Sequence, residues 1–245
     1  MVIFLNSPQH YNKAMKPLPD IVKKYFDLSR SLRVRKIKEA HILQSGYLRE
    51  LRDKRWLKFD ARENLGVSEK KFVWDARVSW KSHLHIHVND RLTAAGGEGR
   101  VSCFGLPIAR SRPGTKMNSS SVCRYLAEGV WAPGILSSPD VEWSAIDDHT
   151  ARAKLNDPYQ LELVFHFRDN GEVDTIFAPA RWGKFEHGLE EKPWEVRLGE
   201  YFDQDGFHLP RTAIVGWYID DVWVPVWKGF VEKIMFVEGN NGIQE

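Results

Sequence analysis

Apolar and polar side chains alternate with a period of two along much of this 245-residue chain. The pattern is cleanest in SHLHIHVND at residues 82–90, where Leu84, Ile86 and Val88 fall on one side. Successive side chains of a β-strand point to opposite faces, so the alternation predicts a strand with one buried face. Similar runs occupy residues 41–51, 56–61, 71–80, 100–104, 141–145, 150–155, 161–167, 173–178, 194–201, 213–219 and 222–236. So many short strands separated by Gly, Asn and Asp turns favour an antiparallel sheet.

The most persuasive helix is predicted within residues 118–133, NSSSVCRYLAEGVWAP. Three serines near its start can cap the first turn, and Pro133 lacks the N–H that a continuing helix needs. Apolar residues recur inside it at spacings of three and four, which predicts an apolar stripe lying on the sheet. Arg124 and Glu128, one turn apart, either form an exposed ion pair or place an acid at the opening of the sheet.

A second, shorter helix is predicted at residues 20–26, where apolar residues recur at helical spacing after two prolines and Leu28 continues the spacing. The expected fold class is therefore α+β. One large, curved, mainly antiparallel sheet, a half-barrel, packs around the central helix, with a short N-terminal helix beside it. Residues 1–245 are expected to form a single domain, with an irregular segment at 1–16 and a C-terminal tail at 237–245.

Three segments without regular alternation are interpreted as connections. The glycine-rich residues 94–99 are followed by a strand-like run rather than by a helix, so they predict a hairpin and not a dinucleotide site. Residues 105–118 contain Pro and Gly and predict a linker into the central helix. Residues 181–193 are polar and irregular and predict a flexible loop.

The composition is that of a folded protein, with 42% apolar and 28% charged residues. Cys103 and Cys123 are too few for a disulfide framework and are expected to be reduced thiols. The start of the chain has only a short apolar run and no basic segment before it, and so does not resemble a signal peptide. No run approaches the ~18 apolar residues of a membrane span. The expected location is cytoplasmic.

The basic residues gather near the N-terminus, because residues 1–55 hold 13 Lys and Arg against 5 Asp and Glu. The densest part, at residues 30–38, could attract an anionic membrane surface. Its alternation with Leu32, Val34 and Ile37 favours instead the solvated face of a strand. The sequence carries no zinc-finger spacing or other nucleic-acid-binding motif, so a nucleic-acid partner is not expected.

RYLAEGVWAP at residues 124–133 and the segments 141–143 and 147–153 together resemble a bacterial family known only as a domain of unknown function. Residues 72–77 and the late Pro193-Trp194 extend this resemblance. The family implies no activity. The order of predicted strands is also similar to that of the periplasmic lipoprotein-carrier fold, which implies a curved sheet around an apolar interior.

Ten tryptophans and thirteen phenylalanines suit either a large core or an apolar binding site. With the carrier-like strand order, they favour binding of an apolar or amphipathic small molecule, such as a lipid or terpenoid-like compound. A structural module, in which the aromatic residues only make core, is the plainer alternative. The expected pocket-lining residues are Trp74, Trp80, Tyr125, Trp131, Trp143, Phe165 and Trp217.

A cofactor-independent acid–base enzyme, acting as an isomerase, cyclase or lyase on such a ligand, is the alternative function. The candidate proton carriers are Glu128, Asp75 and the group Asp147, Asp148 and His149. Burial beside an apolar cavity would raise the pKa of a carboxyl group and make it a usable acid or base. Asp147 and Asp148 are equally typical of an ordinary turn.

Three histidines on one strand face, His83, His85 and His87, are weak candidates for a metal site. Side chains two residues apart on a strand stand ~7 Å apart, whereas a metal needs donors at ~2 Å. Polar-face histidines are the better interpretation. We therefore expect no metal and no cofactor.

Overall fold

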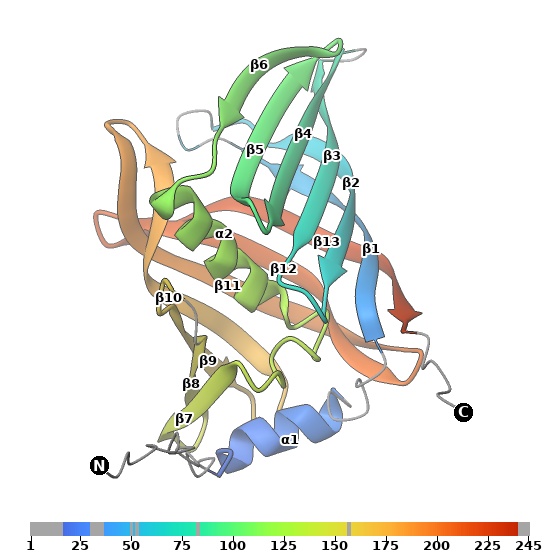
Figure 1. The fold of residues 1–245 in the computed structure, drawn as a ribbon, viewed down its shortest axis with the longest axis vertical. Coiled ribbons are helices and arrows are strands. Elements are labelled where there is room, and N and C mark those ends of the chain that lie inside the picture. Colours follow the sequence, from blue (N-terminus) through green and yellow to red (C-terminus); the bar gives the residue numbers. More distant parts are fainter. Residues whose placement is uncertain are drawn as a thin grey trace, which may run out of the picture.

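The computed structural model describes residues 17–29, 37–49, 51, 54–81, 84–155 and 158–239 (Figure 1). The described helices are α1 (Asp20–Leu28) and α2 (Thr115–Glu128). The described strands are β1 (Ile37–Leu48), β2 (Leu57–Gly66), β3 (Phe72–Lys81), β4 (Leu84–Thr93), β5 (Gly96–Cys103), β6 (Leu106–Ser111), β7 (Val141–Asp147), β8 (Thr150–Leu155), β9 (Glu162–Phe167), β10 (Val173–Phe185), β11 (Gly188–Gln204), β12 (Phe207–Ile219) and β13 (Val222–Glu238). All of these strands form one sheet, which is open rather than closed. The predicted α+β fold is confirmed.

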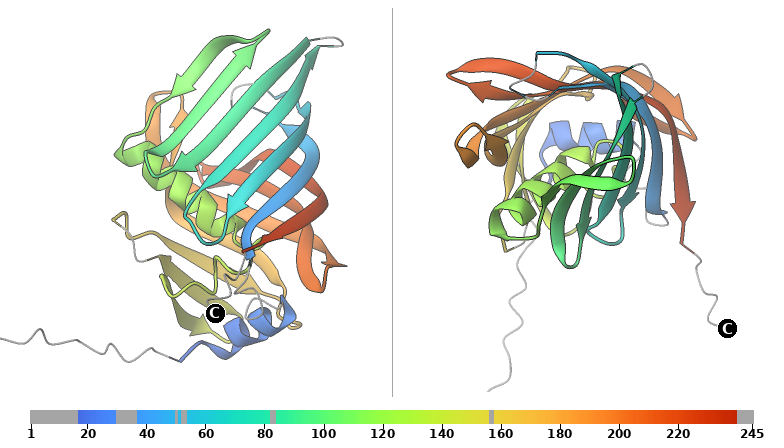
Figure 2. Two further views of the ribbon diagram at one scale, coloured as in Figure 1. Left: turned by 45° about the vertical axis from the view of Figure 1, so that its right-hand side comes forward. Right: turned by 90° about the horizontal axis from the view of Figure 1, so that it is seen from above.

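The sheet consists of two antiparallel meanders that meet at its centre. Strands β1 to β6 run outward to one edge and β13 back to β7 run outward to the other, so the first and last strands pair. Helix α2 connects the two outer edges, β6 and β7. The strongly curved sheet wraps around both helices, which lie on its concave side (Figure 2).

Curvature concentrates where β1 and β13 pair. A register shift follows Leu43, and two glycines, Gly46 and Gly229, stand directly opposite each other. A Cβ atom at Gly46 would lie 2.0 Å from the carbonyl oxygen of Lys228, so only glycine permits this backbone approach. Bulges of this kind bend a strand and increase its twist. The bend turns the concave faces of the two meanders toward each other.

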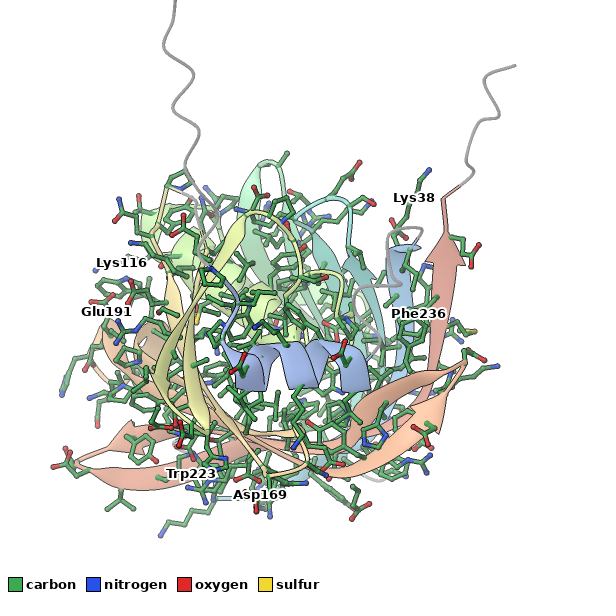
Figure 3. All side chains as sticks on the ribbon, turned by 90° about the horizontal axis from the view of Figure 1, so that it is seen from below. Lys38, Lys116, Asp169, Glu191, Trp223 and Phe236 are labelled. Atoms are coloured by element: carbon green, nitrogen blue, oxygen red, sulfur yellow. The ribbon has the colours of Figure 1, made fainter. Side chains whose placement is uncertain are left out.

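Helix α1 lies across one end of the concave side, as the view from below shows (Figure 3). Trp143 packs edge-on against Phe26 of α1 and against Phe165, with ring centroids 6.1 and 5.0 Å away. Its indole N–H donates to the carbonyl oxygen of Leu136 at 2.9 Å. This half of the interior is therefore packed core, and the space for a site lies along α2.

Helix α2 is displaced from its predicted position. It begins at Thr115 and ends at Glu128, so Ser119 to Ser121 lie inside the helix and do not cap it. The prediction of serine caps is wrong because Asn118 organises this end instead. Its side-chain oxygen accepts the backbone N–H groups of Gly97 and Gly114 at 2.9 and 3.2 Å. Beyond Glu128 the chain continues in tight turns that lead to β7.

Two predicted irregular segments contain strands. Within residues 105–118, β6 pairs with β5 as an exposed edge strand. Residues 181–193 are not a loop, because β10 and β11 extend through them and pair Arg181 with Lys192. A register shift between Ala178 and Arg181 interrupts the alternation there, which hid the strand.

Some expectations concern residues outside the described part. These are the irregular segment 1–16, most of the basic cluster at 30–38, and His83. Neither described helix has the length and hydropathy that a membrane span requires. Cys103 and Cys123 are free thiols, as predicted.

Candidate functional site

A cavity of about 370 Å³ lies between α2 and the concave faces of both meanders. Its walls are largely apolar, with valines from β4, β5, β11, β12 and β13. Four tryptophans also line it: Trp74, Trp131, Trp194 and Trp227. The charged lining residues are Arg49, Asp90, Arg124, Glu128 and Arg181. The cavity thus combines an aromatic wall with an unusual density of charge.

Arg124 is the centre of the charged group. Its guanidinium donates from Nε to Glu128 Oε1 at 2.6 Å, from Nη2 to Glu63 Oε1 at 3.1 Å and from Nη1 to Asp90 Oδ2 at 3.3 Å. Only 18% of its side chain is exposed, and it lies over the ring of Phe72. The ion pair with Glu128 exists, but it is not the exposed helix-surface pair that was one alternative. It belongs to a network of one cation and three acids, of which Glu63 and Glu128 are largely buried and Asp90 is 37% exposed.

Glu63 on β2 is the most buried acid, with no exposed surface. Gln44 Nε2 donates to Glu63 Oε2 at 2.9 Å, and Trp74 Nε1 donates to Gln44 Oε1 at 2.9 Å. Burial and the neighbouring carboxylate of Glu128 raise the pKa of Glu63 well above its usual value, and Arg124 only partly opposes this. We conclude that Glu63 retains a proton well above the pH at which an exposed glutamate loses one.

The side chain that can accept a hydrogen bond from protonated Glu63 is Glu128. Glu128 Oε2 is buried and has no other hydrogen-bond partner among the described residues. The carboxyl groups of Glu63 and Glu128 lie within hydrogen-bonding reach, and this contact raises the pKa of Glu63 further. The two acids can therefore share one proton beside the cavity, with Arg124 bound to both.

Arg181 on β10 is a second half-buried cation of the cavity lining, and it differs from Arg124. Its guanidinium lies over the rings of Trp194 and Trp217, at 4.3 and 5.4 Å from their centroids. Its Nε donates to the backbone oxygen of Ser120 at 3.3 Å. Burial lowers the pKa of Arg181. No carboxylate of the described residues forms an ion pair with it, so it presents a positive charge to the cavity.

The structure brings three of the predicted site residues to the cavity: Trp74, Trp131 and Glu128. Trp217 packs behind Arg181 against Trp194, at a centroid distance of 6.5 Å. Tyr125 lies in the core and donates to the carbonyl oxygen of Gly66 at 2.9 Å. The remaining aromatic candidates stand elsewhere, Trp143 and Phe165 in the packed core and Trp80 half exposed near the end of β3.

The other acid–base candidates lie outside the cavity lining. Asp147, Asp148 and His149 form the exposed β7–β8 turn, where Asp147 Oδ1 accepts the backbone N–H of His149 at 2.9 Å. Asp75 is exposed on β3 and accepts from Asn89 Nδ2 at 3.2 Å. The contact of Asp147 matches the turn interpretation.

The described histidines of β4 do not form a metal site with other described residues. His85 is half buried and His87 exposed on β4. No group of three or more His, Cys, Asp or Glu side chains among the described residues is arranged to hold a metal ion.

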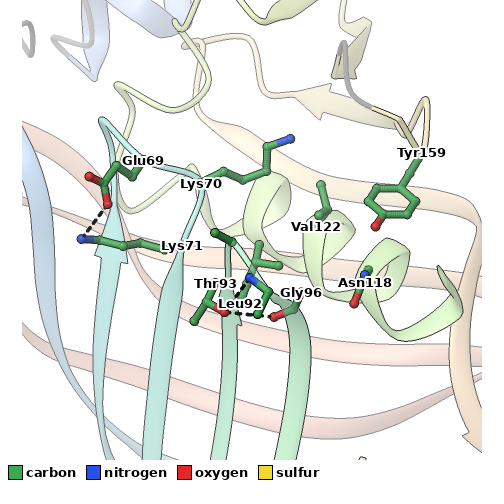
Figure 4. Close-up of a pocket in the computed structure, with 11 residues that line it drawn as sticks. Glu69, Lys70, Lys71, Leu92, Thr93, Gly96, Asn118, Val122 and Tyr159 are labelled. Atoms are coloured by element: carbon green, nitrogen blue, oxygen red, sulfur yellow. Dashed lines mark hydrogen bonds and ion pairs between the residues drawn. The ribbon is translucent and has the colours of Figure 1, made fainter. Parts of the chain in front are cut away.

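A larger hollow of about 680 Å³ lies by the first half of α2, between the β2–β3 turn and the β4–β5 hairpin (Figure 4). Its charged side chains are exposed, and Lys71 pairs with Glu69 at 3.1 Å. The oxygen of Asn118 is already engaged by two backbone N–H groups. Lacking a buried charge or an aromatic wall, this hollow is the weaker candidate.

The model of a family of unknown function, DUF6544, matches residues 8–229, so the chain belongs to that family. The predicted membership of a domain-of-unknown-function family is confirmed. Similar solved structures include a LolA superfamily protein from Nitrosomonas europaea, with 10% identity, coverage of 87% of this chain and 90% of that one, and a TM-score of 0.42. A DUF1329 family protein from Desulfovibrio piger has 9% identity, coverage of 91% and 95%, and a TM-score of 0.46. No curated protein matches the sequence.

Proposed function

We propose that this DUF6544 member binds an amphipathic molecule with an anionic head group, such as a fatty acid, in the cavity beside α2. The observation that carries the proposal is Arg181, a half-buried cation that lines an aromatic cavity and forms no ion pair with any described carboxylate. A buried charge is costly unless it is paired. A carboxylate or phosphate head group would supply the missing partner, and a guanidinium can bind either one in a bidentate manner.

The remaining walls suit the apolar part of such a ligand. The volume of about 370 Å³ lies within the ~300–1,000 Å³ typical of small-molecule sites. Trp131 and Trp194 contribute to the wall, and aliphatic side chains from six strands complete it. The guanidinium of Arg124 is already held by three acids, whereas Arg181 forms no ion pair with a described carboxylate, so we assign the head group to Arg181.

Replacing Arg181 with methionine tests this assignment. We expect Arg181→Met to weaken the binding of decanoate by ~100-fold, because truncating one partner of a buried charge pair costs ~2–5 kcal/mol. Binding of 1-decanol, which lacks the charge, should change by less than ~3-fold. Both affinities can be measured by isothermal titration calorimetry.

Arg197→Met is the matched control for that experiment. Arg197 also lies over a tryptophan, Trp223 at 3.6 Å, but it is exposed at the surface and paired with Glu195. Arg197→Met should leave the affinities for decanoate and 1-decanol unchanged. If Arg181→Met lowered the affinities for decanoate and decanol equally, the cavity as a whole would be damaged. If it lowered neither affinity, Arg181 would not bind the head group.

Proton transfer to a bound ligand is the second candidate function, favoured by the shared proton of Glu63 and Glu128. Glu128 lines the cavity and would be the group that touches the ligand. Glu63 would act through it, as a positioning residue that holds the proton. This candidate requires that Glu63 be protonated near neutral pH, a premise whose test is given in the Discussion.

A further inference from the structure

The tip of the β5–β6 hairpin carries an exposed apolar cluster, Phe104, Leu106 and Ile108, which are 77%, 70% and 61% exposed. The turn is made by Phe104 and Gly105, both with positive φ angles of 50° and 76°. It projects at the top of the molecule in Figure 1, at the end opposite α1. We propose that this tip inserts into the surface of an anionic lipid membrane.

Charge around the cluster favours lipid as the partner. Residues 96–116 contain Arg100, Arg110, Arg112 and Lys116 but only one acid, Glu98. That acid is buried, and the guanidinium groups of Arg91, Arg100 and Arg110 surround it. The hairpin that carries the apolar tip, together with the segment that follows it, is therefore net positive. Exposed apolar side chains flanked by Lys and Arg are typical of segments that bind anionic membrane surfaces.

The tip also lies next to the cavity. Val101 lines the cavity and precedes Phe104 by three residues on the same hairpin, a separation of ~10 Å. Leu106 pairs with Cys103, so it shares the sheet face of Val101. A molecule docked by this tip would hold its cavity close to the bilayer. Membrane docking goes beyond the proposed function, because it depends on the exposed hairpin residues and not on a cavity ligand.

Vesicle sedimentation of the full chain tests the proposal. The probes are vesicles of phosphatidylcholine alone and of phosphatidylcholine with phosphatidylserine in equal parts. We expect the wild-type protein to sediment with the anionic vesicles and not with the neutral ones. High salt should reduce the binding, because the Debye length falls from ~10 Å at 0.1 M to ~3 Å at 1 M ionic strength.

The variant Phe104→Ser/Leu106→Ser/Ile108→Ser should lower partitioning to the anionic vesicles by ~100-fold. All three positions are exposed, so the fold should be retained, which circular dichroism checks. Val222→Ser is the matched control, since Val222 is 63% exposed at the β12–β13 turn, and it should bind as the wild type does. The basic N-terminal residues are identical in every variant and cannot produce the difference.

Three results would overturn the proposal. The first is a wild-type protein that stays in the supernatant with anionic vesicles, and the second is a triple variant that sediments as well as the wild type. The third is self-association of the wild type in analytical ultracentrifugation that the triple variant abolishes, without vesicle binding. That result would make the tip an interface between copies of this chain. Neither experiment involves the cavity ligand, so failure here is separate from failure of the proposed function.

Discussion

Replacing Arg124 with methionine is expected to lower the free energy of unfolding by ~3–5 kcal/mol, because it leaves buried acids without their cation. Glu63, Asp90 and Glu128 all lose a hydrogen bond to the guanidinium in this variant. The loss should also include packing, since the side chain lies over Phe72 and Trp74. Urea denaturation followed by tryptophan fluorescence measures the change.

Arg168→Met is the control for this prediction. Arg168 likewise joins two acids, Glu172 and Asp174, but 37% of its side chain is exposed. Exposed pairs contribute ~0–1 kcal/mol each, so the loss should be clearly smaller than that of Arg124→Met. If Arg168→Met lowered the free energy of unfolding as much as Arg124→Met, the ion pairs of Arg124 would contribute no more to stability than exposed ones.

The second large effect is on the pH dependence of stability. The pKa of Glu63 is raised in the folded protein by burial and by Glu128, so the folded state binds this proton more tightly than the unfolded chain. Its contribution is fully present below the usual value of 4.5 and is lost as pH rises through the folded-state pKa. Glutamine cannot ionise. The stability of Glu63→Gln relative to the wild type should therefore rise with pH above 4.5.

Urea denaturation of both proteins from about pH 4 to about pH 8 measures this difference. Each unit by which the folded pKa exceeds the unfolded one corresponds to about 1.4 kcal/mol. The pKa of Asp90 is also raised by burial, but it titrates in both proteins and largely cancels. A constant difference across this range would mean that the pKa of Glu63 is the same in the folded and unfolded protein, and it would remove the premise of proton transfer.

Glu172→Gln supplies a control of opposite sign. Although burial opposes it, hydrogen bonds from His208, Asn170 and Arg168 lower the pKa of Glu172. Its stabilisation is present above 4.5 and is lost as pH falls through the folded-state pKa. The stability of Glu172→Gln relative to the wild type should accordingly fall as pH rises.

Local patterns were enough to predict most of the fold. The alternation in β4 and the Asp-Asn-Gly turn between β9 and β10 depend on neighbouring residues alone, and both are confirmed. The pattern failed where tertiary pairing disturbed it. The bulge before Arg181, where β10 pairs with β11, broke the period of two. Helix α2 begins at Thr115 with Gly114 as its N-cap residue, so Ser119 to Ser121 lie inside the helix.

The charged network was only partly predictable. Glu128 was identified from its place on the helix, and Trp74 and Trp131 from their size. Glu63 was missed, although it occupies an inward position of β2 between Ala61 and Leu65, where an apolar residue is expected. An acid at an apolar position of an alternating strand was the signal that could have found it. Arg181 was hidden in a segment interpreted as a loop.

Native mass spectrometry of the full chain, with and without added decanoate, tests the claim of ligand binding most directly. The wild-type protein should carry one organic anion, and Val101→Trp, which fills the cavity wall on β5, should carry none. Val73→Trp adds the same group on β3, where Val73 is 37% exposed and outside the cavity lining, and it should bind as the wild type does. A wild-type protein that stays bare in the presence of decanoate, or an adduct retained by Val101→Trp, would contradict the account.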